Sequence, residues 1–146
     1  MNLRLNQLES LPELIGDLNS LKELDLHDNK LIRIPQSIGH LNLLEKLNLS
    51  WNELTTIPDS IGSLKSLKIL DLTRNELKEL PNSIGNLKNL EILNLNDNKL
   101  VNLPESISAL SSLKEIYLSN NKFVEISSSV NKTFEKLKNN GVQIYI

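Results

Sequence analysis

The sequence predicts a single domain of the α/β class, built as a solenoid in which short, similar units stack on one another. Three residue types support this prediction, because proline, glycine and asparagine each recur every 23 residues. The prolines, all of which keep this spacing, are Pro12, Pro35, Pro58, Pro81 and Pro104. The glycines of the series are Gly16, Gly39, Gly62 and Gly85. Recurrence at a fixed period is typical of repeat folds, in which each unit packs only on its neighbours.

The first part of each unit is expected to form a short β-strand. In one unit, Leu47 and Leu49 flank the polar Asn48. Alternation of this kind places both leucines on one face of a strand. A lone strand of this length cannot bury its leucines, whereas stacked copies form a continuous core.

An asparagine follows each strand at the same point of the repeat. Its side-chain amide both donates and accepts hydrogen bonds, so it can satisfy backbone groups in the buried bend between neighbouring coils. We therefore expect a structural ladder of asparagines. Its members are Asn6, Asn29, Asn52, Asn75, Asn98 and Asn121.

The second part of each unit begins at the proline and is expected to be a short helical or irregular segment. Proline is tolerated at the first helical position, because the N–H group that it lacks has no partner there. After Pro58, the side chains of Ile61, Leu64 and Leu67 recur every three residues. We expect these three to turn inward and complete the core.

The first half of the unit reads LxxLxLxxNxL and the second half reads LPxxIGxLxx. Residues 44–66 follow this pattern, with Ile57 in place of the leucine before the proline. This pattern resembles the leucine-rich-repeat family, in its 23-residue bacterial or Ras-group-related class. The resemblance covers nearly the whole chain. It implies a right-handed horseshoe with a parallel β-sheet on the concave face and short helical or irregular segments on the convex face. The regular LPxxIG units favour a bacterial origin.

The C-terminal residues depart from the repeat, so we divide the chain into an array at 1–126, whose first unit is partial, and a cap at 127–146. Ser127 stands where a proline is expected, and the neighbouring serines offer a helix N-cap. Val130, Phe134 and Leu137 share one helical face. Gly141 suits a left-handed helix stop, and the last residues read as a strand. A terminal unit of this kind covers the end of a solenoid core.

No comparable cap is visible at the N-terminus, where Met1 aligns with Leu24 of the next unit. The chain therefore begins within a strand. Three interpretations are open: a fragment of a longer protein, a complete chain with a frayed end, or an open edge that pairs with another molecule. An unpaired strand edge is a template for association, so we include self-association through this edge among the expectations.

Composition and motifs exclude several function classes. The net charge of −2 and the lack of a basic stripe argue against nucleic-acid binding. No apolar run approaches 18 residues, which argues against membrane insertion. The sequence has no cysteine and none of the common catalytic or phosphate-binding motifs. We therefore expect no enzyme activity and no cofactor. The compartment, cytoplasmic or secreted, stays open.

A metal site also finds little support. His27 lies beside Asp25, but Asp25 and Asp71 are two strands apart in the repeat. At about 4.8 Å per strand, that separation is too large for both carboxylates to bind one small cation. We therefore expect no metal ligands, and we interpret the acidic residues as solvated charges on a strand face.

Function is expected on the exposed strand positions and the turn after them. Trp51 and Arg74 occupy one row in adjacent units, at a spacing that suits a cation–π contact. Ile69 and Ile92 are adjacent in another row. Trp, Tyr and Arg, the residue types of Trp51, Tyr117 and Arg74, are enriched in binding hot spots. The chain is thus predicted to be a non-catalytic protein-binding module. Its candidate contact residues are Trp51, Ile69, Asp71, Arg74, Ile92, Asn94 and Tyr117.

Other interpretations are open. The same side chains could pack only on their neighbours and contact no partner. The chain could also be a structural or self-associating repeat element, or the accessory repeat domain of a longer protein.

Overall fold

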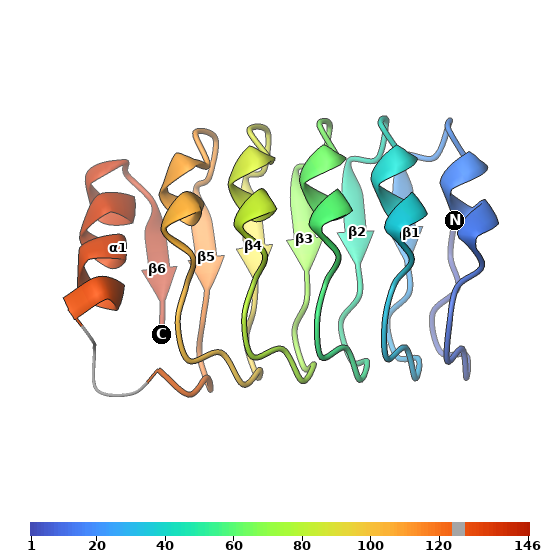
Figure 1. The fold of residues 1–146 in the computed structure, drawn as a ribbon, viewed down its shortest axis with the longest axis horizontal. Helices are drawn as coiled ribbons and strands as arrows, with labels where there is room; N and C mark the ends of the chain where they lie inside the picture. The colour runs from blue at the N-terminus through green and yellow to red at the C-terminus, as the bar shows by residue number, and fades with distance from the viewer. Residues whose placement is uncertain (124–127) are drawn as a thin grey trace.

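A computed structural model describes residues 1–123 and 128–146. The chain winds into a row of coils, with strands along one side and short helices along the other, and the two termini lie at opposite ends (Figure 1). The strands form one parallel sheet in sequence order. They are β1 (Glu23–Asp25), β2 (Lys46–Asn48), β3 (Ile69–Asp71), β4 (Ile92–Asn94), β5 (Glu115–Tyr117) and β6 (Gln143–Tyr145). The predicted parallel sheet, the short helical segments opposite it and the C-terminal helix and strand are all present.

Strand register follows the 23-residue period, so equivalent residues of successive units lie side by side. Leu47 of β2 is paired with Leu70 of β3, and Lys46 with Ile69. Residues 1–5 extend the sheet beyond β1, where the Leu3 N–H donates to the Asp25 carbonyl at 2.8 Å. From β1 to β4, the central leucine of each strand is therefore paired with a leucine or isoleucine of the next strand. The result is one continuous aliphatic core, in which Leu47 and Leu70 are fully buried.

The opposite side of the row carries one 3-10 helix per unit. These are η1 (Glu13–Asp17), η2 (Gln36–His40), η3 (Asp59–Ser63), η4 (Asn82–Asn86) and η5 (Glu105–Ala109). Each proline lies immediately before its helix, as the N-cap residue, and not at the first helical position as predicted. The proline carbonyl accepts the first helical hydrogen bond, as from the Ile61 N–H to the Pro58 oxygen at 3.0 Å. Ile61, Leu64 and Leu67 turn inward as expected and are fully buried.

Glycine is required where successive helices approach each other. A Cβ atom built on Gly39 lies 2.5 Å from the Ser60 backbone oxygen and 2.8 Å from the Ser60 Cβ. The other three glycines of the series meet the serine of the next coil in the same way. A glycine and a small residue thus set the stacking distance on this side of the solenoid.

The asparagine ladder is confirmed in its interior. Asn75 donates to the Leu72 carbonyl in its own coil at 3.1 Å and to the Leu49 carbonyl in the preceding coil at 2.9 Å. Its side-chain oxygen accepts the Leu54 N–H at 3.0 Å. A longer bond reaches the Thr73 carbonyl at 3.4 Å. One buried side chain therefore satisfies four backbone groups across two coils. Asn6, in the first coil, is exposed and donates only to the carbonyls of Leu3 and Arg4.

The C-terminal end is covered by α1 (Ser128–Asn139) and by β6, which pairs with β5. Val130, Phe134 and Leu137 are buried on the face predicted for them. The helix ends as predicted at Gly141, whose φ is 81°. The N–H groups of Gly141 and Val142 donate to the carbonyls of Lys138 and Leu137, the paired bonds of a Schellman motif. Ser127, the serine N-cap and the proposed boundary at 126/127 lie outside the described residues.

At the N-terminal end, several apolar side chains are exposed among the described residues. Leu5 and Leu14 are 65% and 71% exposed, and Leu18 is also exposed. Leu14 occupies the position at which the later units place Ser37, Ser60, Ser83 and Ser106. The two ends of the core are therefore finished in different ways.

Candidate protein-binding surface

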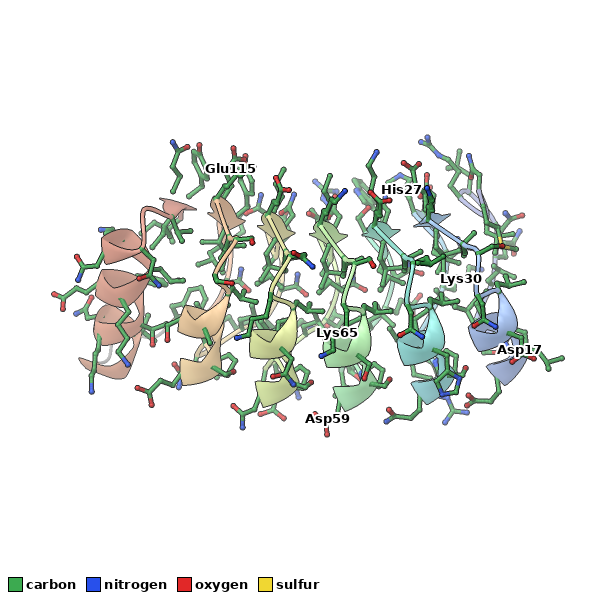
Figure 2. All side chains as sticks on the ribbon, turned by 90° about the horizontal axis from the view of Figure 1, so that it is seen from above. Asp17, His27, Lys30, Asp59, Lys65 and Glu115 are labelled. Atoms are coloured by element: carbon green, nitrogen blue, oxygen red, sulfur yellow. The ribbon has the colours of Figure 1, made fainter. Side chains whose placement is uncertain are left out.

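The exposed side of the sheet, which we call the sheet face, is formed by four rows of side chains. Two rows come from the first and third residues of each strand, and two come from the turn that follows. Figure 2 shows His27 and Glu115 on this side, while Asp59 lies among the helices on the other. Every candidate residue from the sequence lies in one of these rows.

The middle row, at the third strand residue, has a structural task that the sequence analysis missed. The side-chain oxygen of Asp71 accepts the Thr73 N–H at 2.9 Å, and that of Asn94 accepts the Asn96 N–H at 3.2 Å. Asn2, Asp25 and Asn48 make the same contact in their coils. The fold therefore favours Asp or Asn in this row, in addition to any role that these residues have in binding.

The outermost row, in the turn, is constrained as well. Its members all have positive φ, between 53° and 57°. They are Leu5, Asp28, Trp51, Arg74, Asp97 and Asn120. Asn and Asp adopt this left-handed backbone more readily than other non-glycine residues, because their short side chains can bond locally. Trp51 and Arg74 thus hold an unfavoured conformation at positions where Asp or Asn serves in three other units.

Trp51 is held in place by a chain of side-chain contacts along this row. The Arg74 guanidinium carbon lies 3.9 Å from the centre of the Trp51 ring, which confirms the predicted cation–π contact. Arg74 also faces Asp97, with 3.7 Å between Nε and Oδ2. Asp97 in turn accepts a hydrogen bond from the Asn120 amide at 2.8 Å. Trp51 is nevertheless 46% exposed, so an oriented aromatic ring is presented to solvent.

Ile69 and Ile92 are directly paired in the first row and are half-buried. Two shallow hollows lie between this pair and Trp51, and they share Asn48 and Asp71. One, of ≈ 240 Å³, is bordered by Lys46 and Ile69 among others. The other, of ≈ 370 Å³, is bordered by His27, Trp51 and Thr73 among others. Both hollows lie over β1 to β4.

Tyr117 lies at the other end of the sheet face, beside the cap. Its ring stacks on Tyr145, with 4.5 Å between centroids and 8° between planes. Its hydroxyl donates to the Glu115 carboxylate at 2.6 Å, and this bond raises the pKa of Tyr117 to about 12. Because Tyr117 has no side-chain acceptor for the Ser119 N–H, Asn96 of the neighbouring coil accepts that bond at 2.8 Å.

The predicted contact residues therefore form three pairs in three rows. Trp51 pairs with Arg74, Ile69 pairs with Ile92, and Tyr117 pairs with Tyr145 of the cap. Asp71 and Asn94 lie between the first two pairs, and both line the ≈ 370 Å³ hollow. Tyr145 was missed because the register of β6 on β5 cannot be read from the repeat.

A second missed feature is a row of alternating charges just before the strands. In successive coils it reads Lys22, Glu45, Lys68, Glu91 and Lys114. Lys68 pairs with Glu45 and Lys114 pairs with Glu91. The hydrogen bond from Lys68 holds the pKa of Glu45 below its usual value, and the bond from Lys114 does the same for Glu91. Aligning the units by their 23-residue period would have revealed this alternation.

Ion pairing leaves part of the acidic charge on the sheet face uncompensated. Glu23 pairs with Lys46 at 2.9 Å. Within residues 1–123 and 128–146, no ion pair engages Asp25, Asp28 or Asp71. The same residues contain no group of three or more His, Asp or Glu side chains placed to hold a metal ion. Nor is any helix in the described part of the chain long and apolar enough to cross a membrane.

Comparison with known proteins identifies the type of repeat. The family model described as a leucine-rich repeat region matches residues 43–139, and a leucine-rich repeat model matches residues 1–54. No protein with a curated functional description matches the sequence.

Two solved structures resemble the chain along almost its whole length. A leucine-rich-repeat protein of Leptospira interrogans is 38% identical, with a TM-score of 0.90 over 99% of this chain. An internalin of Listeria monocytogenes is 22% identical, with a TM-score of 0.75 over 97% of this chain, and this likeness shows the fold alone. The chain spans 36% and 39% of the lengths of these two proteins. The Leptospira similarity supports the bacterial origin that the sequence favoured.

Proposed function

Because the chain belongs to the leucine-rich-repeat family, whose domains are generally non-catalytic and bind proteins, we propose that it is a protein-binding module that uses its sheet face. The proposed contact residues are those that the sequence singled out. They are Trp51, Ile69, Asp71, Arg74, Ile92, Asn94 and Tyr117.

The observation that supports this proposal best is the backbone conformation of Trp51. Its φ of 55° disfavours a large side chain, and left-handed backbone costs a residue other than Gly, Asn or Asp about 1–2 kcal/mol. Strained positions of this kind cluster at functional sites. Nothing in the core requires the indole, since it is 46% exposed and the equivalent Asp28 and Asp97 serve the same turn.

The test replaces Trp51 by the residue that its backbone prefers. Trp51→Asn combined with Ile92→Thr should change the free energy of unfolding by less than about 1 kcal/mol. Relief of the turn offsets a cation–π contact worth ~0.5–1 kcal/mol, and threonine suits a strand. Loss of a hot-spot tryptophan should weaken partner binding by ~2 kcal/mol or more, about 30-fold in Kd. Isothermal titration with the identified partner measures the change.

The matched control lies on the helical side of the same coils. Asp59→Ala with Asn82→Ala removes two exposed side chains from the first turns of η3 and η4. Lys65 and Lys88 are poorer controls, because their ammonium groups donate to the carbonyls of Gly62 and Gly85. Binding that survives the sheet-face change but is lost in the control would place the contact on the helical side.

A second candidate function is self-association through the N-terminal coil. It is favoured by the exposed side chains of Leu5, Leu14 and Leu18, which lie next to the core of this coil. Pairing of the strand edge contributes less, since the Arg4 N–H donates to Asn2 and the Arg4 carbonyl accepts from Asn6. We therefore attribute any association to side-chain packing. Molecular mass measured against concentration separates it from binding to a different protein.

A third candidate, an accessory repeat domain of a longer protein, is favoured by the coverage of 36% of the Leptospira chain. The sequence that flanks this chain in its genome tests it directly.

A further inference from the structure

We propose that the face of the Trp51 indole opposite Arg74, together with the Asp28 carboxylate, receives the cationic side chain of an arginine or lysine of the protein partner. This inference rests on the proposed function, because it names the chemistry of the group that docks on the sheet face. It concerns one position in the turn row and one type of side chain.

The first step is the geometry around the ring. Arg74 comes from the coil that follows Trp51 and covers one face of the indole at 3.9 Å. The other face is therefore directed toward the preceding coil, which contributes His27 and Asp28. His27 meets the ring edge-on, with 6.2 Å between centroids and 71° between planes. The Nδ1 atom of His27 is hydrogen-bonded to Ser50 at 2.9 Å, which fixes the imidazole.

The second step is the space beyond Asp28. Asp28 holds the same position and the same left-handed backbone as Trp51, one coil earlier. Neighbouring strands lie about 4.8 Å apart, and an aspartate side chain is much shorter than an indole. The outer part of the Trp51 ring therefore projects past Asp28. Both residues are exposed, so a ligand can reach the ring face and the carboxylate together.

The third step is the arrangement that the molecule already uses on the other face of the ring. There, the Arg74 guanidinium lies between the aromatic face of Trp51 and the carboxylate of Asp97. A partner cation placed over the outer ring and Asp28 would likewise contact an aromatic face and a carboxylate, although Asp28 lies one coil from Trp51 and Asp97 lies two. The flat guanidinium group stacks on aromatic faces and bonds to carboxylates.

The fourth step is the local charge. Asp25, Asp28 and Asp71 have no ion-pair partner within the described ranges. Asp71 lines the hollow that His27 and Trp51 also border, Asp25 accepts the His27 N–H, and Asp28 follows His27 in the chain. Arg4, which lines the hollow beside His27 and Trp51, and Arg74 are the opposing charges. Arg74 is itself opposed by Asp97 at 3.7 Å, so three carboxylates against Arg4 remain, and they favour a cationic side chain over an anionic one. The protein itself thus supplies both an attractive and a repulsive residue for testing.

The experiment uses the blocked peptide acetyl-Gly-Arg-Gly-amide and its citrulline analogue, which has nearly the same shape without the charge. Binding is followed by NMR through the indole N–H of Trp51, the only tryptophan in the chain. The arginine peptide should shift this signal and its neighbours in a saturable way, at least five-fold more tightly than the citrulline peptide. Equal affinity for the two peptides would overturn the proposal.

Three variants locate the effect. Asp28→Asn keeps a residue suited to positive φ. It should weaken binding of the arginine peptide about two- to five-fold, the range expected for one exposed charge pair. Arg4→Gln should strengthen binding of the arginine peptide, because it removes a like charge. Asp59→Asn is the matched control, an exposed aspartate in η3 on the helical side, and should leave the affinity unchanged. If Asp28→Asn binds like the parent protein, the site is not at Asp28.

The same variants separate this inference from the proposed function. If Trp51→Asn weakens binding of the protein partner while Asp28→Asn and added salt leave the affinity unchanged, the sheet face is still the binding surface, but the bound group is not a cation. If Trp51→Asn leaves the affinity for the protein partner unchanged and the helical-side control lowers it, the proposed function is wrong, even if the arginine peptide binds at Trp51.

Discussion

The two ends of the solenoid differ in how far their apolar core is covered. At the C-terminal end, α1 covers the last coil with Val130, Phe134 and Leu137 and is tied to η5 by an ion pair between Lys136 and Glu105. At the N-terminal end, the equivalent surface is left with leucines in solvent, and Leu14 is 71% exposed. A repeat buries its core only where another layer covers it. Stability should therefore be unequal along the chain.

The hydrogen bonds of the asparagine ladder also differ between the interior and the N-terminal end. Asn75, in the middle, satisfies four backbone groups in two coils, whereas Asn6, at the open end, makes two bonds within its own coil. The two asparagines occupy the same position of the repeat. What differs is the presence of a preceding coil, so the same residue type should carry different weight at the end and in the interior.

The largest effect is expected from removal of the C-terminal cover. We propose that residues 127–146 act as a cap, so deletion of residues 128–146 should expose the leucine core of the last coils. The truncated chain should aggregate or unfold at a much lower temperature, as measured by light scattering and circular dichroism. Removal of Ile146 alone, which is exposed, is the control and should have little effect. A truncated chain that stays monomeric and unfolds cooperatively would contradict the assignment.

A smaller effect is expected from the asparagine ladder, where the interior and the end can be compared directly. Asn75→Leu leaves buried backbone groups unpaired at ~1–3 kcal/mol each, so the free energy of unfolding should fall by about 2–4 kcal/mol. Asn6→Leu should lower it by less than about 1 kcal/mol, since its two acceptors are exposed. Urea denaturation of both variants measures the difference, and equal losses would show that position along the solenoid does not matter.

The smallest effect on stability is expected at the open end itself. Leu14→Ser restores the residue found at this position in the later coils. It should change the free energy of unfolding by less than about 0.5 kcal/mol, because the side chain is mostly in solvent. If the chain self-associates through this end, the same change should weaken the association, as measured by sedimentation across a range of concentrations. Unaltered association would exclude Leu14 from the contact.

The candidate site was only partly legible in the sequence. The contact between Trp51 and Arg74 followed from their spacing of 23 residues, because equivalent residues of adjacent coils must touch. The left-handed turn that holds them was missed, although Asp28, Asp97 and Asn120 at the same position are residues that favour such a turn. The backbone role of Asp71 and Asn94 was missed for a similar reason, since strand-end aspartates and asparagines commonly bond to nearby N–H groups.

The sequence by itself determined the repeat, the inward leucines, the asparagine ladder and the helix stop at Gly141. These features depend on local periodicity and on neighbours at a constant offset, which the 23-residue spacing fixes. The tertiary structure alone decided how the series ends: the pairing of β6 with β5, the stacking of Tyr145 on Tyr117 and the exposure of Leu14. At the ends the periodicity stops, so the packing there depends on contacts that no repeat encodes.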